Sequence, residues 1–375
     1  MPGPQPFVKL PRAALAILAC ALVAALSGCQ RKPQFVPASA DSSLAGWHDS
    51  LAGQVRVLQE RWSAGGAGED AARLTAEVLL RDLRAQVGAD PGVSWERRAR
   101  ALLDSLDVGA EFAGAPCVLI VNFFSRSDPT AGSWPWVFWC AGGTGDSTAR
   151  ILAQSVEGQN LSLLAVASRG LGGGSAMPSP AAPRSIAALF ARRSGSGQQP
   201  TLMTWRVGAR LELAQALGPD SLGGVGTGAF ESHGDSGIVL ATRTWQPTPR
   251  FDECATCPHV FRLRRFRWGA DGFARVEDQI IASPYVAFVQ LIQALTAGDR
   301  DAALRRVTGS ALLEAARRAD WASFRGPWRA APGREEDGDQ MIFYRGPSEA
   351  WKVHFVRRGT DWLVDSFAPT TRVIE

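Results

Sequence analysis

The sequence predicts an α+β protein with an N-terminal helical region, a central antiparallel β-rich domain and a C-terminal α+β domain. The chain has 375 residues, more than one typical domain, and its hydrophobic content of 46% is enough for large cores. Apolar residues recur at helical spacing up to about residue 110. Beyond that point, short apolar runs alternate with turns rich in Gly, Ser and Pro, which is typical of strands.

Residues 1–28 have the pattern of a signal peptide. Lys9 and Arg12 precede an apolar run over residues 13–25, which is too short to span a hydrocarbon core of ~30 Å comfortably. Removal of this segment leaves 38 basic against 36 acidic residues in the mature chain. This balance is too weak for a nucleic-acid-binding surface, so no nucleic acid partner is expected.

The block Leu26-Ser27-Gly28-Cys29 ends the leader and resembles the lipobox of bacterial lipoproteins. The resemblance implies cleavage before Cys29 and lipid chains, palmitate among them, that hold the protein at a membrane of the cell envelope. Each buried CH₂ group contributes about 0.8 kcal/mol, so several chains bind almost permanently. Gln30, where an Asp would retain the protein at the inner membrane, favours the outer membrane facing the periplasm in a cell with two membranes. Residues 29–43 are polar and contain prolines, which predicts a flexible tether.

Export places four further cysteines where disulfides persist. Cys117 opens one apolar run and Cys140 closes the next, with turn residues Asp128 and Pro129 between the runs. An antiparallel hairpin centred there places Cys117 opposite Cys140 at ~5.5 Å, within reach of a disulfide. We therefore expect this pair to be bonded.

Cys254 and Cys257 form a Cys-X-X-Cys motif. A strand-like run follows it, whereas a thioredoxin-like redox site requires a helix. A zinc site would draw on His259 and a distant His233, but the chain has no second motif to complete the ligand set. We expect a small disulfide-closed loop, with a metal or redox role as the alternatives.

Residues 44–110 are predicted to be helical. One apolar stripe runs over residues 44–62, and a second, from Leu74 to Leu83, ends at Gly88. Ser94 caps a third helix, which Gly109 terminates. Residues 111–278 are predicted to form the Trp-rich β domain, as an irregular antiparallel sandwich or barrel. A faint repeat there ends a strand near Trp139, Trp205 and Trp268.

Residues 279–375 begin with a helix from Pro284 to Gly298 and a second capped by Asp299. Strand-like runs follow over residues 321–329, 340–345, 350–358 and 361–367. This order resembles the NTF2-like (cystatin-like, cone-shaped) domain. The family includes enzymes with an Asp/His pair in the cone and non-catalytic modules. Asp339, His354 and Asp365 are the polar candidates for such a pocket, and no family catalytic motif surrounds them.

No catalytic constellation accompanies these features. His233 begins a Gly-Asp-Ser-Gly block like that of trypsin-type proteases, but the upstream histidine block of that family is missing. We therefore expect a non-enzymatic, lipid-anchored envelope protein without a cofactor or metal, which binds a small ligand or another envelope protein. The alternatives are a hydrolase or isomerase using His354 in the cone, and a metal or redox role at Cys254 and Cys257.

Overall fold

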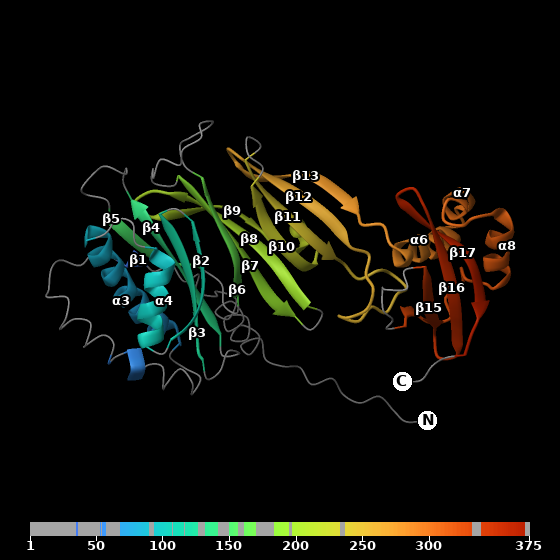
Figure 1. The fold of residues 1–375 in the computed structure, drawn as a ribbon. Coiled ribbons are helices and arrows are strands. Elements are labelled where there is room, and N and C mark those ends of the chain that lie inside the picture. The colour runs from blue at the N-terminus through green and yellow to red at the C-terminus, as the bar shows by residue number, and fades with distance from the viewer. Residues whose placement is uncertain are drawn as a thin grey trace, which may run out of the picture. The chain divides into compact units, whose positions relative to one another are not determined.

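The α+β class predicted from the sequence is confirmed by helices and four antiparallel sheets (Figure 1). No helix in the described part of the chain is long and apolar enough to cross a membrane. The leader, Cys29 and most of the predicted tether lie outside the described residues. The structure is a computed structural model that describes residues 35–36, 53, 55–57, 68–89, 94–106, 108–115, 117–126, 132–141, 150–156, 161–169, 184–194, 197–232, 237–331 and 339–371.

Two helices follow the predicted N-terminal pattern, α3 (Gly68–Ala89) and α4 (Trp95–Ser105). Ser94 caps α4 as predicted, because its hydroxyl oxygen accepts a hydrogen bond from the Arg97 N–H at 3.4 Å. The predicted end of α4 is wrong by a few residues, since the helix stops at Ser105 and Gly109 already begins a strand. The few described residues of the first predicted helix, 53 and 55–57, also have helical backbone.

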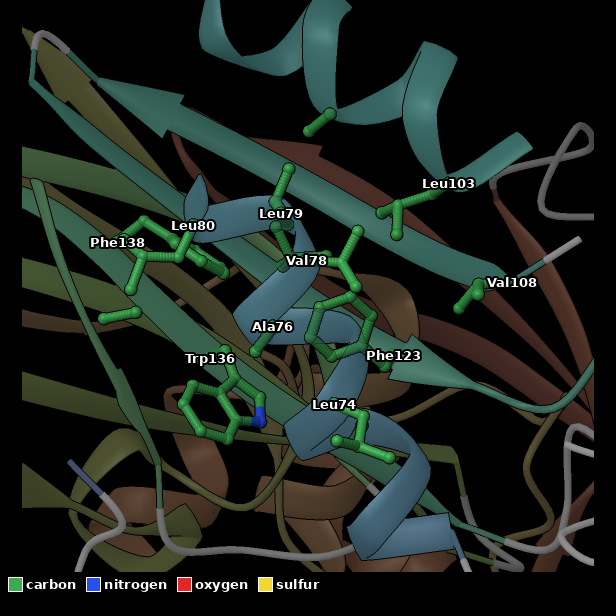
Figure 2. Packing of buried hydrophobic residues seen from close by; sticks show 14 of the residues in the cluster. Leu74, Ala76, Val78, Leu79, Leu80, Leu103, Val108, Phe123, Trp136 and Phe138 are labelled. Carbon is green, nitrogen blue, oxygen red and sulfur yellow. The ribbon is translucent and has the colours of Figure 1, made fainter. Parts of the chain in front are cut away.

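Both helices cover one face of the first sheet (Figures 1 and 2). The apolar stripe of α3 contacts Phe123, Trp136 and Phe138 from the sheet. Arg98 of α4 donates two hydrogen bonds to the buried Asp82 of α3, at 2.7 and 2.8 Å. The sheet has the order β1-β5-β4-β3-β2, with β1 (Phe35–Val36), β2 (Gly109–Ala115), β3 (Val118–Phe124), β4 (Ser133–Ala141) and β5 (Arg150–Ser155).

The next two sheets are four-stranded meanders in simple chain order. Strands β2 to β5 of the first sheet are also consecutive neighbours. Each tryptophan of the predicted repeat lies on the third strand of such a set of four: Trp139 on β4, Trp205 on β8 and Trp268 on β12. The second sheet contains β6 (Leu161–Arg169), β7 (Ser185–Ser194), β8 (Gly197–Val207) and β9 (Leu211–Leu217). After the short helix α5 (Pro219–Leu222), the third contains β10 (Val225–Ser232), β11 (Ile238–Trp245), β12 (Arg262–Gly269) and β13 (Gly272–Ile280).

These three sheets share apolar cores. Trp139 of the first sheet packs with Phe190 and Trp205 of the second. The opposite face of the second sheet contributes Leu189 and Leu202 to a cluster that contains Trp268 of the third. Each face of the second sheet is therefore buried against a neighbouring sheet.

Two glutamine side chains link the last strand of one sheet, in chain order, to the last strand of the next sheet. Gln154 of β5 donates to the Leu211 carbonyl (3.3 Å) and accepts from the Leu211 N–H (3.1 Å). Gln215 of β9 makes the same pair of bonds with Phe273 of β13, at 3.0 and 2.8 Å. Each side chain thus satisfies the backbone of the next sheet where no strand pairing does so.

The other face of the third sheet is charged. Arg265 of β12 donates to Glu277 of β13 at 2.8 Å and lies 3.7 Å from Glu231 of β10. Ion pairs this exposed contribute little to stability, because water and salt screen them. The charged side chains nevertheless keep this face of the third sheet in contact with water, whereas both faces of the second sheet are buried.

The last sheet, β14-β15-β16-β17, packs against helix α6 (Pro284–Ala297). The predicted caps of this region are confirmed: Gly298 ends α6 with φ 71°, and the Asp299 carboxylate accepts from the Ala302 N–H at 2.9 Å. The remaining elements are α7 (Arg300–Leu304), α8 (Ser310–Arg318), β14 (Trp328–Ala330), β15 (Gln340–Arg345), β16 (Glu349–Arg358) and β17 (Asp361–Pro369).

The predicted strand over residues 321–329 is largely wrong, because only its last two residues belong to β14. Asp320, just before this segment, has φ 56° and Gly326, within it, has φ 114°, so the backbone turns where the sequence predicts a strand. Trp321 is fully buried without belonging to a strand. Its apolar character reflects the core and not a strand pattern.

The two glutamines yield a stability prediction. Gln154→Leu and Gln215→Leu each remove two hydrogen bonds and leave buried backbone groups of Leu211 or Phe273 unpaired, which should cost about 1–3 kcal/mol of unfolding free energy per variant. Gln279→Leu, at an exposed position on β13, is the matched control and should change stability by less than about 0.5 kcal/mol. Urea unfolding measures all three, and equal losses in the three variants would contradict the role of the glutamines.

Candidate functional site

The interior of the C-terminal domain is filled by aromatic rings. Phe288 of α6 stacks on Phe343 of β15 with ring centroids 3.7 Å apart. Trp321 and Trp328 meet Phe288 edge-on at 5.4 and 5.1 Å, and all four side chains are nearly inaccessible to solvent. The space between helix and sheet, where a cone-shaped domain would hold a ligand, is therefore occupied by side chains.

Part of this core comes from the long loop between β11 and β12, residues 246–261. Phe251 packs edge-on against Tyr285 and Phe288, at 5.8 and 6.3 Å. The backbone of the loop pairs with the edge strand β14, because the Trp328 N–H donates to Arg250 and the Trp328 carbonyl accepts from Asp252, both at 2.8 Å. The C-terminal core thus depends on a segment that precedes it by about 30 residues.

A buried polar contact fixes the same loop. The Glu253 carboxylate accepts from the Tyr285 hydroxyl at 2.7 Å and from the Thr248 N–H at 3.0 Å. Burial, together with the neighbouring Glu253 charge, raises the pKa of Tyr285. Tyr285 therefore remains a hydrogen-bond donor at all ordinary pH values.

Cys254 and Cys257 are joined by a disulfide directly after Glu253. The Cys257 N–H bonds the Cys254 carbonyl at 3.0 Å, so the motif closes a tight turn. The chain then runs without a helix to β12, whereas a thioredoxin-like site requires a helix after the motif. The described residues contain no group of three His, Cys, Asp or Glu side chains arranged to hold a metal ion, and His233 lies outside them.

His259 follows the disulfide loop and is buried, with only 5% of its surface exposed. Its ring stacks on Trp245 at 3.5 Å, and both ring nitrogens lack a hydrogen-bond partner in the described part of the chain. Burial lowers the pKa of His259, while the Glu253 carboxylate and the carbonyls of Ala255 and Cys254 act in the opposite direction. The neutral imidazole of His259 therefore packs as an aromatic ring where the loop contacts Trp245 of β11.

The three polar residues predicted for a pocket do not enter the filled interior. Val353 and Phe355 of β16 face the core, so the intervening His354 points to the other face of the sheet. Asp365 is the extra residue where the pairing of β16 with β17 shifts, and its side chain is exposed. Asp339 is exposed, and its backbone carbonyl accepts from the Phe355 N–H. The structure thus places the three residues near one another along the strands and outside the aromatic interior.

Cys117 and Cys140 lie opposite each other as predicted. Val118 pairs with Trp139, and the Cys140 N–H donates to the Cys117 carbonyl at 3.1 Å. The expected disulfide is not formed in the structure, where both cysteines are free thiols. Strand register determines which residues face each other, but it does not determine whether their sulfurs are oxidised.

A surface pocket of about 170 Å³ lies beside the start of α6. Drug-sized ligands usually occupy ~300–1,000 Å³, so the hollow is closer in size to a single side chain. It combines apolar, aromatic and charged groups from three segments, among them Ile280, Ser283, Val286, Gln290, Arg306, Asp361 and Trp362.

Sequence reasoning missed the loop contacts and this pocket. One available signal was Tyr285, one of only two tyrosines in the chain, in the apolar run that begins helix α6. A buried tyrosine needs a partner for its hydroxyl, so its presence indicated a polar contact from another segment. Nothing in the local sequence identified Glu253 as that partner.

Comparison with protein-family models, with curated proteins and with solved structures gave no match for this chain.

The buried histidine yields a pH prediction. Because the folded pKa of His259 lies below its ordinary value of about 6.5, the unfolded chain binds a proton more readily. Stability conferred by the neutral ring is complete above pH ~6.5 and decreases as the pH falls toward the folded pKa. His259→Phe keeps an aromatic plate on Trp245 and cannot be protonated. Urea unfolding at pH 7 and pH 5 should show a smaller loss for the variant than for the wild type, and equal losses would contradict this account.

Proposed function

We propose that this chain is an exported, lipid-anchored envelope protein that acts as a non-catalytic assembly module. The filled C-terminal interior carries the proposal. An enzyme built on a cone-shaped domain uses an internal cavity, whereas here Phe288, Phe343, Trp321 and Trp328 occupy that space. Recognition must then take place on the surface.

The C-terminal order of helices followed by a four-stranded antiparallel meander supports the proposed NTF2-like relationship. Members of that superfamily include non-catalytic modules as well as enzymes. The division into a helical region (44–110), a Trp-rich β domain (111–278) and an NTF2-like domain (279–375) belongs to the same proposal. Because Phe251 packs into the C-terminal core, the proposed NTF2-like domain also includes a segment of the preceding β domain.

The Cys254–Cys257 disulfide supports export, because disulfides persist mainly in oxidising compartments. With the Leu-Ser-Gly-Cys block ending at Cys29, it favours a folded domain outside the cytoplasm that is held by lipid. In a cell with two membranes, Gln30 favours the outer membrane facing the periplasm.

The pocket beside α6 is the surface we assign to a protein partner. Trp362 and Arg306 line it, and these residue types dominate the energetics of protein interfaces. Ile280, with 37% of its surface exposed, adds apolar area at the rim. A side chain of the partner matches the volume of the pocket better than a free organic ligand does.

Lipid attachment is tested by metabolic labelling with radioactive palmitate. Wild-type chain should incorporate the label and sediment with membranes, whereas Cys29→Ser should incorporate none. Cys117→Ser is the matched control and should behave like the wild type. Label that persists in the Cys29→Ser variant would refute the anchor.

The partner surface is tested by a photo-crosslinking phenylalanine analogue placed at Trp362 in native membranes. We expect one discrete adduct at this position. The same probe at Arg267, exposed on the third sheet, should give none. Identical adducts from both positions, or none from Trp362, would contradict the assignment of the pocket.

A further inference from the structure

Cys117 has an unusual backbone conformation. It lies in the turn between β2 and β3, where Ala115 pairs with Val118, and its φ is 58°. Residues other than Gly, Asn and Asp seldom adopt this left-handed region, so the backbone at Cys117 is strained. The strand pairing on both sides and the hydrogen bond from the Cys140 N–H hold the strained residue in place.

The two thiols differ in access to solvent. Cys140 is buried with 7% of its surface exposed, whereas Cys117 is half-buried in the turn. The two residues face each other across the strand pair, where the Cys140 N–H donates to the Cys117 carbonyl. An accessible thiol beside a buried one is the arrangement in which the first attacks a substrate and the second resolves the adduct.

The two thiols also differ in acidity. The neighbouring Cys140 thiol lowers the pKa of Cys117 to about 7, against the opposing effect of burial. The neighbouring Cys117 sulfur, together with burial, raises the pKa of Cys140. A thiolate at Cys117 is thus available near neutral pH.

We infer that Cys117 and Cys140 form a redox-active dithiol that reduces an accessible disulfide, with Cys117 as the attacking sulfur and Cys140 as the resolving one. The Cys117 thiolate attacks one sulfur of the substrate disulfide, forms a mixed disulfide and releases the first substrate thiolate. Cys140 then attacks the Cys117 sulfur, and its proton passes to the second departing thiolate. Two electrons move from the dithiol to the substrate, and each protein molecule reduces one disulfide.

This role goes beyond a structural crosslink and does not depend on the lipid anchor. A crosslink requires only that two sulfurs meet. The strained turn and the unequal exposure distinguish Cys117 from Cys140 in the way that an ordered two-step exchange requires. The Cys254–Cys257 disulfide, already closed in the structure, provides an internal reference in the same chain.

The test uses the full chain in detergent, treated with dithiothreitol under native conditions, desalted and mixed with oxidised glutathione. Peptide mass spectrometry follows each cysteine. In Cys140→Ser, glutathione should accumulate on Cys117. In Cys117→Ser, the adduct on Cys140 should form at least tenfold more slowly. In the wild type, a Cys117–Cys140 disulfide should form with release of two glutathione thiols.

Three results would overturn the inference: equal adduct rates in the two variants, absence of the Cys117–Cys140 disulfide in the wild type, or a pair that dithiothreitol cannot reduce in the folded protein. Circular dichroism of both Ser variants establishes that they are folded. The alkylation rate of Cys117 in Cys140→Val, measured against pH, gives a second readout. Without the Cys140 thiol, its midpoint should move above that of the wild type, and an unchanged midpoint would show that Cys140 does not activate Cys117.

Discussion

The packing of Phe251 into the C-terminal core is the contact on which the rest of the C-terminal half depends. It brings a loop of the β domain under helix α6, where it meets Tyr285 and Phe288. Glu253, two residues on, accepts a hydrogen bond from Tyr285, and the disulfide at Cys254 and Cys257 closes the turn beyond it. Apolar burial drives the insertion, and the hydrogen bond and disulfide fix its register.

A solid interior changes where function can lie. The rings of Phe288, Phe343 and Trp321 pack together between helix α6 and the last sheet, and His354 of β16 lies on the other face of that sheet. The surface then presents a side-chain-sized hollow at Arg306 and Trp362, and chemistry is concentrated elsewhere, at the thiols of Cys117 and Cys140. The proposals of a lipid anchor, one contact surface and one reactive thiol pair account for these features together.

Local signals made much of the fold predictable. Caps at Ser94, Gly298 and Asp299 act within one helical turn, and the register of Cys117 against Cys140 follows from one hairpin. The sequence predicts a strand at Trp321 because a buried aromatic residue gives the same apolar signal in a strand and in a turn. Contacts between distant segments, such as Glu253 with Tyr285 or Gln154 with Leu211, have no local signature. The candidate pocket could not be predicted for the same reason: the packing of the interior depends on residues from many separate segments, from Phe251 in the loop to Val364 on β17.

The most direct test of the account is the stability of the last sheet after Phe251→Ala, compared with Phe324→Ala. Phe324 belongs to the same domain but has 64% of its surface exposed. Hydrogen exchange at the slowest amides of β15 and β16 reports the opening free energy of this sheet. A solid core predicts a loss of about 3–5 kcal/mol for Phe251→Ala and less than about 0.5 kcal/mol for Phe324→Ala. Equally small losses in both variants would show that the loop does not complete the core and that the interior is not tightly filled.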